Sequence, residues 1–437
     1  MKQKINLGVV CLARNTFDFN AAKEIYKDIL LDLGKLENVE LVARENLVMD
    51  EEDADKAGRY FASQLVDGIA VISGTFHLGH LVMQIKEKCN KPLLLWGLPE
   101  LPYNGGKIRL NSVCGVNLNA SNLTKANYTD FTYTISSSID NNWVDAIRIK
   151  AALSGAKIGI VGYRAHGFFN VGVDELSTYR QFGCLIDHYE LAEVFAQVTE
   201  NCRVEYYENK TNKAFDCSNL TVEQKEKVIT LAAKLEAFVK SRKLSVLAIR
   251  CWPEFASEYG VSPCAAMSLV QDEGYILACE GDIDCGVTML CHKAIGAMTP
   301  FMADLSQVNI QENFALMWHC GVAPCSLCDG VCQNTLDTYF AGGKGVTAGF
   351  VMKTGQISIA RLDSSGGKYR LFQESGQALP MEKLLTGTYA KCRFDKDMKT
   401  VLDKVVYSGI AHHVSMVYGD YKKVFSIFAR LLKMEEL

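Results

Sequence analysis

The sequence contains neither a run of about 18 apolar residues nor an excess of basic residues. The first absence argues against a membrane-spanning helix, and a net charge of −4 gives no basic surface for nucleic acid or an acidic membrane. The patterns G-x-G-x-x-G and G-x-x-x-x-G-K-[ST] are also missing, so nothing indicates dinucleotide or ATP binding. We therefore expect a partner that is a small molecule.

The chain has 437 residues, which at about 150 residues per domain predicts about three domains. Hydrophobic residues make up 49% and charged residues 22%, as in ordinary folded enzymes. The start of the chain, MKQKINLGVVCLARN, has too short an apolar run for a signal peptide, so we expect a first strand there. The 16 cysteines are scattered and several lie in apolar runs, which predicts reduced, buried thiols in a cytoplasmic protein.

Strand-like and helix-like patterns alternate through the first two thirds of the chain. The first cycle predicts strands at 5–12, 39–43, 68–73 and 92–96 and helices at 20–33, 51–65 and 80–88. After a polar, Asn-rich passage at 117–130, a second cycle predicts strands at 157–161, 194–195, 246–250 and 275–279 and a helix at 221–240. Such alternation predicts parallel sheets covered by helices, and we place two Rossmann-like α/β domains at 1–155 and 156–297.

The last third of the chain has a different sequence pattern, which predicts short strands between glycine-rich turns. Strands are predicted at 343–351, 356–362, 368–372 and 389–393, and a closing helix at 420–432. This antiparallel pattern predicts a β-rich, barrel-like domain over residues 298–437.

Three short apolar runs each end in a side chain that can bind a metal ion, namely Glu280, Asp304 and His319. The carboxyl ends of strands are where α/β proteins keep their chemistry. Together with the pair His412–His413, these residues predict a centre of oxygen and imidazole ligands, suited to Mn²⁺ or Mg²⁺. Adjacent residues in an extended segment face opposite ways, so one histidine of the pair is expected on the metal.

Each of these residues also has a structural interpretation. Asp304 fits a turn at a strand end, and His319, between Trp318 and Cys320, fits a buried core histidine. Asp282 is more readily a cap for the helix that begins at residue 283 than a ligand, because acidic residues favour helix N-termini.

Loops after other strands carry residues that suit a polar ligand. Arg14 and His77 follow first-domain strands, and the segment Arg250–Glu254 (RCWPE) offers Trp252 and Glu254 for a sugar. Ordinary surface loops, or a core position for Trp252, explain these residues equally well.

Four cysteines, Cys320, Cys325, Cys328 and Cys332, have the spacing C-x4-C-x2-C-x3-C. The first three match plant-type iron–sulfur spacing, and C-x2-C also suits zinc. However, the fourth ligand of such a cluster normally lies far downstream, and zinc ribbons pair two C-x2-C knuckles. We therefore do not expect these thiols to bind a metal.

The motifs RCWPE, ACEGD (278–282), WHCGVAP (318–324) and the segments 301–304 and 410–413 resemble the L-fucose isomerase and L-arabinose isomerase superfamily, especially its shorter fucose isomerase-like members. The resemblance covers nearly the whole chain. It implies two Rossmann-like domains before a β-rich domain.

The resemblance also implies metal and catalytic residues. Glu280, Asp304 and His413 match the Mn²⁺ ligands of fucose isomerases, and His319 lies near a further ligand of arabinose isomerases. Mg²⁺ or Co²⁺ are alternatives to Mn²⁺. The implied reaction is aldose–ketose isomerisation through a cis-enediol, with Glu280 and Asp304 moving the proton and His412 near the substrate.

Family members form trimers or hexamers with active sites at subunit interfaces, so the resemblance implies a homo-oligomer in which Arg14 and His77 serve a neighbour's site. The substrate stays open. Short members include isomerases of sulfoquinovose, for which Arg14, Lys23, Arg164 and His166 offer sulfonate contacts. A sugar-binding protein and a metal-dependent aldolase or lyase are the competing hypotheses.

Overall fold

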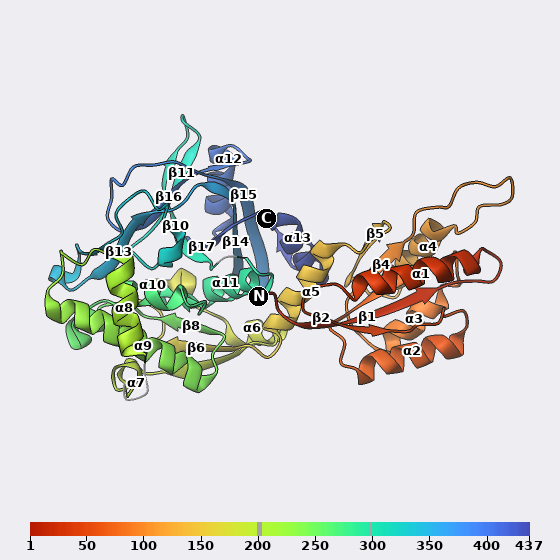
Figure 1. The fold of residues 1–437 in the computed structure, drawn as a ribbon, viewed down its shortest axis with the longest axis horizontal. Coiled ribbons are helices and arrows are strands. Elements are labelled where there is room, and N and C mark those ends of the chain that lie inside the picture. Colours follow the sequence, from red (N-terminus) through yellow and green to blue (C-terminus); the bar gives the residue numbers. More distant parts are fainter. Residues whose placement is uncertain (199–202, 298) are drawn as a thin grey trace. The chain divides into compact units, whose positions relative to one another are not determined.

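The computed structural model describes residues 1–198, 203–297 and 299–437 (Figure 1). The chain forms two compact units. Unit 1 comprises residues 1–151 and 423–434, and unit 2 comprises residues 152–422 and 435–437. The division into three domains stays a prediction, and its second boundary falls at residue 298, outside the described residues.

Unit 1 is built on a parallel sheet with the strand order β2-β1-β3-β4-β5. Its strands are β1 (Ile5–Leu12), β2 (Val39–Ala43), β3 (Gly68–Ser73), β4 (Leu93–Gly97) and β5 (Phe131–Ile135). Its helices are α1 (Phe19–Leu33), α2 (Glu51–Ser63), α3 (His80–Lys88), α4 (Ser112–Lys125), most of α5 (Asn141–Leu153) and most of α13 (Lys422–Leu431). The strands and helices predicted for this region are confirmed, and the Asn-rich passage at 117–130 contains part of helix α4.

Strand β3 shows why this sequence forms a parallel sheet. All six of its residues are buried, which requires cover on both faces of the sheet. The C-terminal helix α13 returns to this unit, where the Arg430 guanidinium donates to the Phe131 carbonyl at 3.1 Å.

Unit 2 contains a second parallel sheet, with the order β7-β6-β8-β9. Its strands are β6 (Lys157–Val161), β7 (Leu185–Tyr189), β8 (Val246–Ile249) and β9 (Leu277–Ala278). The helices of this part are α6 (Glu175–Phe182), α7 (Leu191–Phe195), α8 (Val204–Ala214), α9 (Val222–Arg242), α10 (Cys264–Gln271) and α11 (Ile283–Ala294). The strand predicted at 194–195 is wrong, since these residues end helix α7. The missed strand is β7, whose sequence LIDHY is too polar to show as a buried run.

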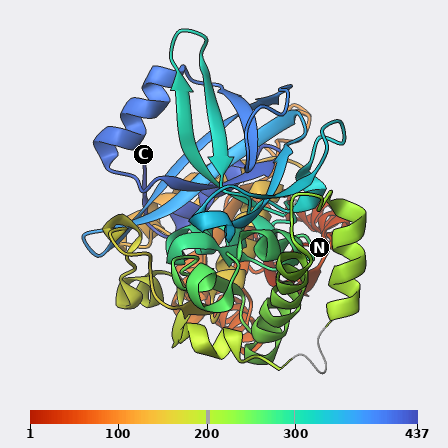
Figure 2. The same ribbon diagram turned by 90° about the vertical axis from the view of Figure 1, so that its left-hand side faces the viewer.

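The rest of unit 2 is an antiparallel barrel. Among the described residues, its strands pair in the ring β16-β11-β10-β17-β14-β15, and pairing of β15 with β16 closes it. They are β10 (Phe301–Asn309), β11 (Phe314–His319), β14 (Gly355–Ser365), β15 (Lys368–Leu379), β16 (Thr388–Phe394) and β17 (His413–Tyr418). Figure 2 shows the β10–β11 hairpin as the upright pair of blue-green arrows. The predicted barrel-like architecture is confirmed.

Further elements of unit 2 extend the barrel sheet or lie in the connections between strands and helices. They are β12 (Thr335–Thr338), β13 (Val346–Val351), β18 (Glu435–Glu436), helix α12 (Met398–Ser408) and the short helical turns η1 (Phe169–Val171), η2 (Phe255–Tyr259), η3 (Cys279–Gly281), η4 (Cys325–Leu327) and η5 (Ala341–Gly343).

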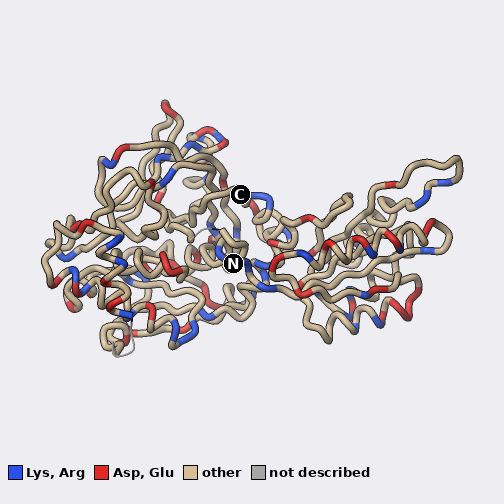
Figure 3. Tube along the Cα trace, in the orientation of Figure 1, with Lys and Arg blue, Asp and Glu red and all other residues tan. Residues whose placement is uncertain are grey.

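Acidic and basic residues both occur in each unit (Figure 3). Within the described ranges, every helix is too short or too polar to cross a lipid bilayer.

Candidate active site

Glu280 lies in a strained turn directly after strand β9. Its φ angle of 62° is in the left-handed region, which a glutamate adopts rarely. The next residue, Gly281, also has a positive φ, and a Cβ atom there would come within 2.4 Å of the Tyr163 carbonyl oxygen. The Ala165 amide donates to the Glu280 carbonyl at 3.2 Å, which fixes the turn. Strain of this kind, held in place by its surroundings, is a common mark of a functional site.

The barrel brings Asp304 and His413 together. These residues are directly opposite each other on the antiparallel strands β10 and β17, so their side chains share one face. The prediction that Asp304 ends a strand is wrong, because β10 continues to Asn309. Strand pairing, rather than a strand end, places this carboxylate.

Four side chains converge here. The Nε2 atom of His413 lies 3.3 Å from Glu280 Oε2 and 3.4 Å from Asp304 Oδ1, and the ring centroids of His319 and His413 are 5.7 Å apart. Four buried atoms form no hydrogen bond within the described structure, namely Glu280 Oε2, Asp304 Oδ1, His319 Nε2 and His413 Nε2. Buried polar atoms are rarely left unpaired, so this set fits a divalent cation with oxygen and imidazole ligands.

A buried ion network orients His413. Its Nδ1 atom lies 2.8 Å from Asp282 Oδ2, and Asp282 accepts from Arg361 Nη1 at 2.8 Å. The Arg361 guanidinium also donates to the His413 carbonyl at 3.0 Å. Because the Nδ1–H of His413 donates to Asp282, the neutral form of this ring directs its Nε2 lone pair at the centre. Metal-binding histidines have the same arrangement.

Asp282 also caps helix α11. Its Oδ1 atom accepts from the Cys285 amide at 2.9 Å, which confirms the capping role predicted for this residue. The same carboxylate therefore links the start of a helix to the His413 ring.

The charges of the site depend on one another. Burial alone would raise the pKa of Glu280, but the neighbouring imidazoles of His412 and His413 outweigh it and hold this pKa well below its usual range. The pKa of Asp282 is likewise low because Arg361 and His413 outweigh burial. For His413, burial is outweighed by Asp282 and Glu280, which raise its pKa to about 9. The ionised Glu280 carboxylate is thus available to a cation, whereas Asp282 is held by Arg361 and His413.

His319 has the opposite hydrogen-bond pattern from His413. Its Nδ1 atom accepts the Cys320 backbone N–H at 2.9 Å, so the neutral ring carries its proton on Nε2. A protonated nitrogen donates and does not ligate. This geometry suits a hydrogen bond from His319 to a substrate oxygen, and its role as a fourth metal ligand stays a prediction.

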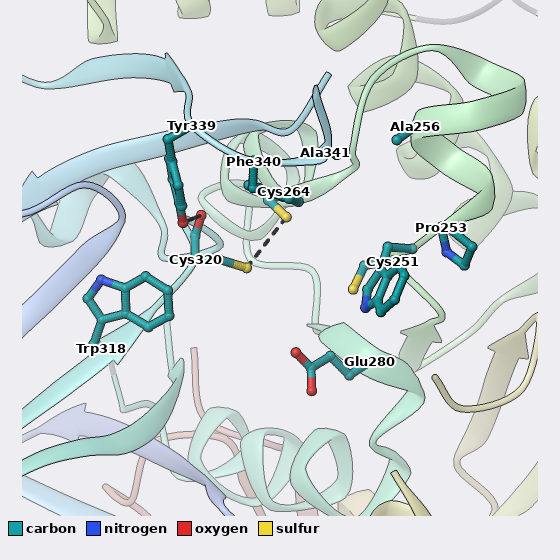
Figure 4. A pocket seen from close by; sticks show the side chains of 11 residues that line it. Cys251, Pro253, Ala256, Cys264, Glu280, Trp318, Cys320, Tyr339, Phe340 and Ala341 are labelled. Carbon is teal, nitrogen blue, oxygen red and sulfur yellow. Dashed lines mark hydrogen bonds between the residues drawn. The ribbon is translucent and has the colours of Figure 1, made fainter. Parts of the chain in front are cut away.

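A cavity of about 600 Å³ opens beside Glu280, within the size range of small-molecule sites (Figure 4). Its walls are mainly apolar, aromatic and thiol side chains, which include Trp252, Trp318, Tyr339, Phe340, Cys251, Cys264 and Cys320. Flat aromatic faces of this kind suit the apolar faces of a sugar ring.

Two of the thiols meet in the cavity wall. The sulfur atoms of Cys264 and Cys320 are 3.7 Å apart. Contacts with Cys279 and Cys320 hold the pKa of Cys264 well below the usual thiol range.

The remaining predicted residues of unit 2 lie around the cavity and the turn. The predicted substrate residue Trp252 lines the cavity, whereas Glu254 forms an ion pair with Arg250 at 2.8 Å. The Nε2 atom of His412 is 3.5 Å from Glu280 Oε2, and its Nδ1 atom is 3.2 Å from Asn170 Nδ2. Their contacts with substrate stay predictions.

Arg14 and His77 belong to unit 1. His77 is fully buried beside Ser73 and Asn119, and burial lowers its pKa to about 4. Arg14 is half-buried, and its backbone N–H donates to Thr75 Oγ1 at 2.8 Å. Their proposed contacts with substrate stay predictions.

The sequence analysis missed Arg361, Cys264 and Asn170. A signal existed for Arg361, because a lone arginine within the apolar run ISIARL indicates a buried ion pair. The positions of Cys264 and Asn170 come from distant segments, so no local pattern marks them.

Comparison with known proteins shows relatives over the whole chain. Residues 8–154 match the family model described as the N-terminal domain of fucose/sulfoquinovose isomerase. A sulfoquinovose isomerase of Priestia megaterium is 26% identical over 445 residues, covering 99% of each chain. One of Alkalicoccus urumqiensis is 25% identical over 381 residues, covering 84% of this chain and 85% of the relative.

Among solved structures, a periplasmic solute-binding protein from Actinobacillus succinogenes with bound D-allose is 12% identical, covering 67% of this chain and 92% of that one. Its TM-score of 0.18 is too low to support any conclusion.

The matches and the site together define an enzyme of the isomerase class. More particularly, the chain is similar to the fucose/sulfoquinovose isomerases, through the family model that matches residues 8–154 and through the relatives that match over its whole length.

Proposed function

We propose that this protein is a metal-dependent aldose–ketose isomerase that acts on a monosaccharide. The proposal rests on one observation above all, the convergence of unpaired carboxylate and imidazole atoms beside a sugar-sized cavity. The names of the relatives agree with it. We also propose that the protein is a homo-oligomer, as the family resemblance implies.

Glu280, Asp304 and His413 would hold the cation, and Mn²⁺ fits this oxygen and nitrogen set. When bound, a divalent cation supplies Lewis-acid polarisation of the sugar carbonyl and the adjacent hydroxyl. His319 would donate its Nε2 proton in a hydrogen bond to a sugar oxygen.

In the direction from aldose to ketose, a carboxylate removes the proton from C2, which gives a cis-enediol, and the resulting carboxylic acid, whose proton exchanges with solvent, delivers a proton to C1. The low pKa of Glu280 keeps it ionised and able to accept this proton, and its side chain also lines the cavity. Asp304, beside it, would assist the transfer and reverse its role in the other direction. The hydroxyl proton of O2 passes to O1, so the substrate and the product are isomers.

Proton NMR in D₂O tests the proposal. A panel of L-fucose, D-arabinose, L-arabinose and sulfoquinovose is incubated with the protein and Mn²⁺, and again with EDTA. We expect a metal-dependent ketose with deuterium at the carbon beside the carbonyl. Cleavage products would instead show a lyase, and unchanged sugars that nevertheless bind would show a sugar-binding protein.

Metal binding is expected to depend on pH through His413. Its pKa of about 9 means that the ring is protonated at neutral pH in the metal-free protein, and a cation must displace that proton. Affinity for Mn²⁺ should therefore rise about tenfold per pH unit between about pH 6 and 8, where one proton is released per ion. Isothermal titration calorimetry at three pH values measures this slope.

The control for this pH dependence is His413→Gln, which should bind Mn²⁺ more weakly and with a much smaller slope. Glu280 adds nothing to the slope, because its low pKa keeps it ionised over this range. A wild-type affinity independent of pH would contradict the assignment of His413.

Sulfoquinovose is the first specific substrate to test, because both named relatives are isomerases of that sugar. In this chain Arg164 is half-buried, its guanidinium lies 4.5 Å from the ring centre of Phe169, and it forms no ion pair with any carboxylate in the described structure. Its neighbour Ala165 contacts the Glu280 backbone. This placement suits an arginine that binds the sulfonate of a substrate.

Arg164→Ala is expected to raise KM for sulfoquinovose about 10–100-fold, the value of one charge-assisted hydrogen bond. A neutral aldose that the enzyme accepts should keep its KM, and Arg180→Ala, on helix α6, serves as a matched charge control. An equal effect on charged and neutral sugars would show that Arg164 supports the fold and does not bind the anion.

A further inference from the structure

The four-cysteine motif does not act as one unit. Cys320 turns toward Cys264 in the cavity wall, and Cys325 lines a separate cavity together with Asp272. Cys328 and Cys332 face each other, with their sulfur atoms 3.9 Å apart. The motif therefore contributes one pair of facing thiols outside the proposed isomerase centre.

The carboxylate of Asp329 lies beside the two thiols. Donor atoms of Cys328, Asp329 and Cys332 all lie within 4.8 Å of one another. Two thiolates bound to one tetrahedral zinc ion at about 2.3 Å are about 3.8 Å apart, close to the separation found here. The three side chains thus already have the spacing of ligands on one ion.

The backbone around the three side chains supplies two N–H donors to the thiol sulfurs, whereas burial raises the pKa of both thiols. The Gly330 amide donates to Cys328 Sγ at 3.4 Å, and the Val351 amide donates to Cys332 Sγ at 3.3 Å. Hydrogen bonds from N–H groups stabilise the charged form of an acceptor, as in other metal–thiolate sites. The donor from strand β13 also means that two separate segments build the site.

The site is open to entering ions and firmly connected to the sheet. Its three residues are half-buried, so a cation can reach them from solvent. The Asp329 amide donates to the Val351 carbonyl at 3.0 Å, which ties the loop to β13.

We propose that Cys328, Asp329 and Cys332 form a second metal site, for a thiophilic divalent cation such as Zn²⁺. Each thiol releases its proton to solvent when the cation binds, and water completes the tetrahedral coordination. Sulfur ligands bind such a cation in preference to Mn²⁺, which prefers oxygen and imidazole ligands. The thiol site would therefore bind Zn²⁺ and the proposed isomerase centre Mn²⁺.

The position of this site indicates what the ion would do. The three residues lie in the connection between β11 and β12, and the neighbouring residues Trp318 and Tyr339, one before and one after that connection, line the cavity beside Glu280. A bound ion would hold this connection in place and so stabilise one wall of the cavity beside Glu280.

Cobalt binding tests the proposal. The reduced, metal-free full-length protein is titrated with Co²⁺, and near-ultraviolet absorption reports charge transfer from thiolate to cobalt. We expect a band that saturates within two equivalents, because the proposed isomerase centre also takes up Co²⁺ without producing the band. Zn²⁺ should remove the band, and Cys328→Ser and Cys332→Ser should both lose it. Cys325→Ser, from the same motif, is the matched control and should keep the band.

No band in the wild type, or a band that survives in both variants, would overturn the proposal. The proposed isomerase ligands are carboxylates and imidazoles, which give no such band, so this result is independent of isomerase activity.

A second measurement avoids substitutions altogether. Zn²⁺ should slow alkylation of Cys328 and Cys332 by iodoacetamide at least tenfold, as followed by mass spectrometry of the wild-type protein. The exposed thiol of Cys114 should react at an unchanged rate. Equal rates for Cys328 and Cys332 with and without Zn²⁺ would overturn the proposal even if the serine variants fail to fold.

Discussion

Glu280→Gln is expected to reduce kcat of the proposed isomerase by about 10³-fold or more, because it removes both a metal ligand and a proton-transfer group. The amide cannot accept the proton from the sugar carbon, and its weaker charge lowers the affinity for the cation. The affected carboxylate atom, Oε2, is the one 3.3 Å from His413 Nε2 and makes no hydrogen bond in the described structure. Steady-state kinetics at saturating Mn²⁺ measure the effect.

Thermal unfolding should show that this variant still folds. The ionised carboxylate interacts favourably with the imidazoles of His412 and His413, so the metal-free variant should melt somewhat lower than the wild type but still in one cooperative transition. The matched control is Glu273→Gln, which alters a carboxylate paired with Arg203 and Lys210 outside the site and should retain activity. Full turnover by Glu280→Gln would rule out its assigned role.

Asp282→Asn is expected to weaken Mn²⁺ binding about 10–100-fold, although Asp282 is not a proposed ligand. The carboxylate holds the Nδ1 proton of His413 at 2.8 Å and thereby directs the Nε2 lone pair to the centre. A neutral amide at this position holds the ring less firmly and makes the nitrogen less basic. Calorimetric titration with Mn²⁺ measures the loss.

The same substitution should also destabilise the fold, by about 3 kcal/mol, because the buried Arg361 loses one of its two carboxylate partners and keeps only Asp363. Asp284→Asn is the matched control. Asp284 is a neighbouring buried carboxyl that accepts from Ser364 and Tyr369, and burial raises its pKa to about 6. This control should leave Mn²⁺ affinity unchanged, and an equal loss of affinity in both variants would show a general effect of destabilisation.

Local patterns were enough for much of the fold. The predicted strands and helices of unit 1 are present because their apolar residues recur at strand or helix spacing, and β3 buries all six of its residues. Sequence patterns did not predict strand β7, because its sequence LIDHY is polar. They also predicted a strand at 194–195, where two apolar residues belong to a helix. Tertiary context overrides propensity in such short segments.

Part of the candidate site could also be predicted. Glu280 was recognised because a buried strand ends in an acidic and glycine-rich turn, and the pair His412–His413 because two adjacent imidazoles do not suit an apolar core. The cap formed by Asp282 followed from its position before a helix. Its second role, as the partner of His413, could not follow, because the two residues are 131 positions apart.

The sequence by itself therefore determined two α/β sheets, a β-rich barrel and a set of metal-competent side chains, since these depend on periodicity and on residue type. The tertiary structure alone decided which of those side chains meet and with which atoms. Barrel closure sets Asp304 opposite His413, and the buried Arg361 fixes Asp282. Hydrogen bonds at Nδ1 of the two rings leave His413 Nε2 to bind a cation once its proton is displaced, and leave His319 Nε2 as a donor. These properties depend on angles and distances between remote segments, which no local pattern of residues encodes.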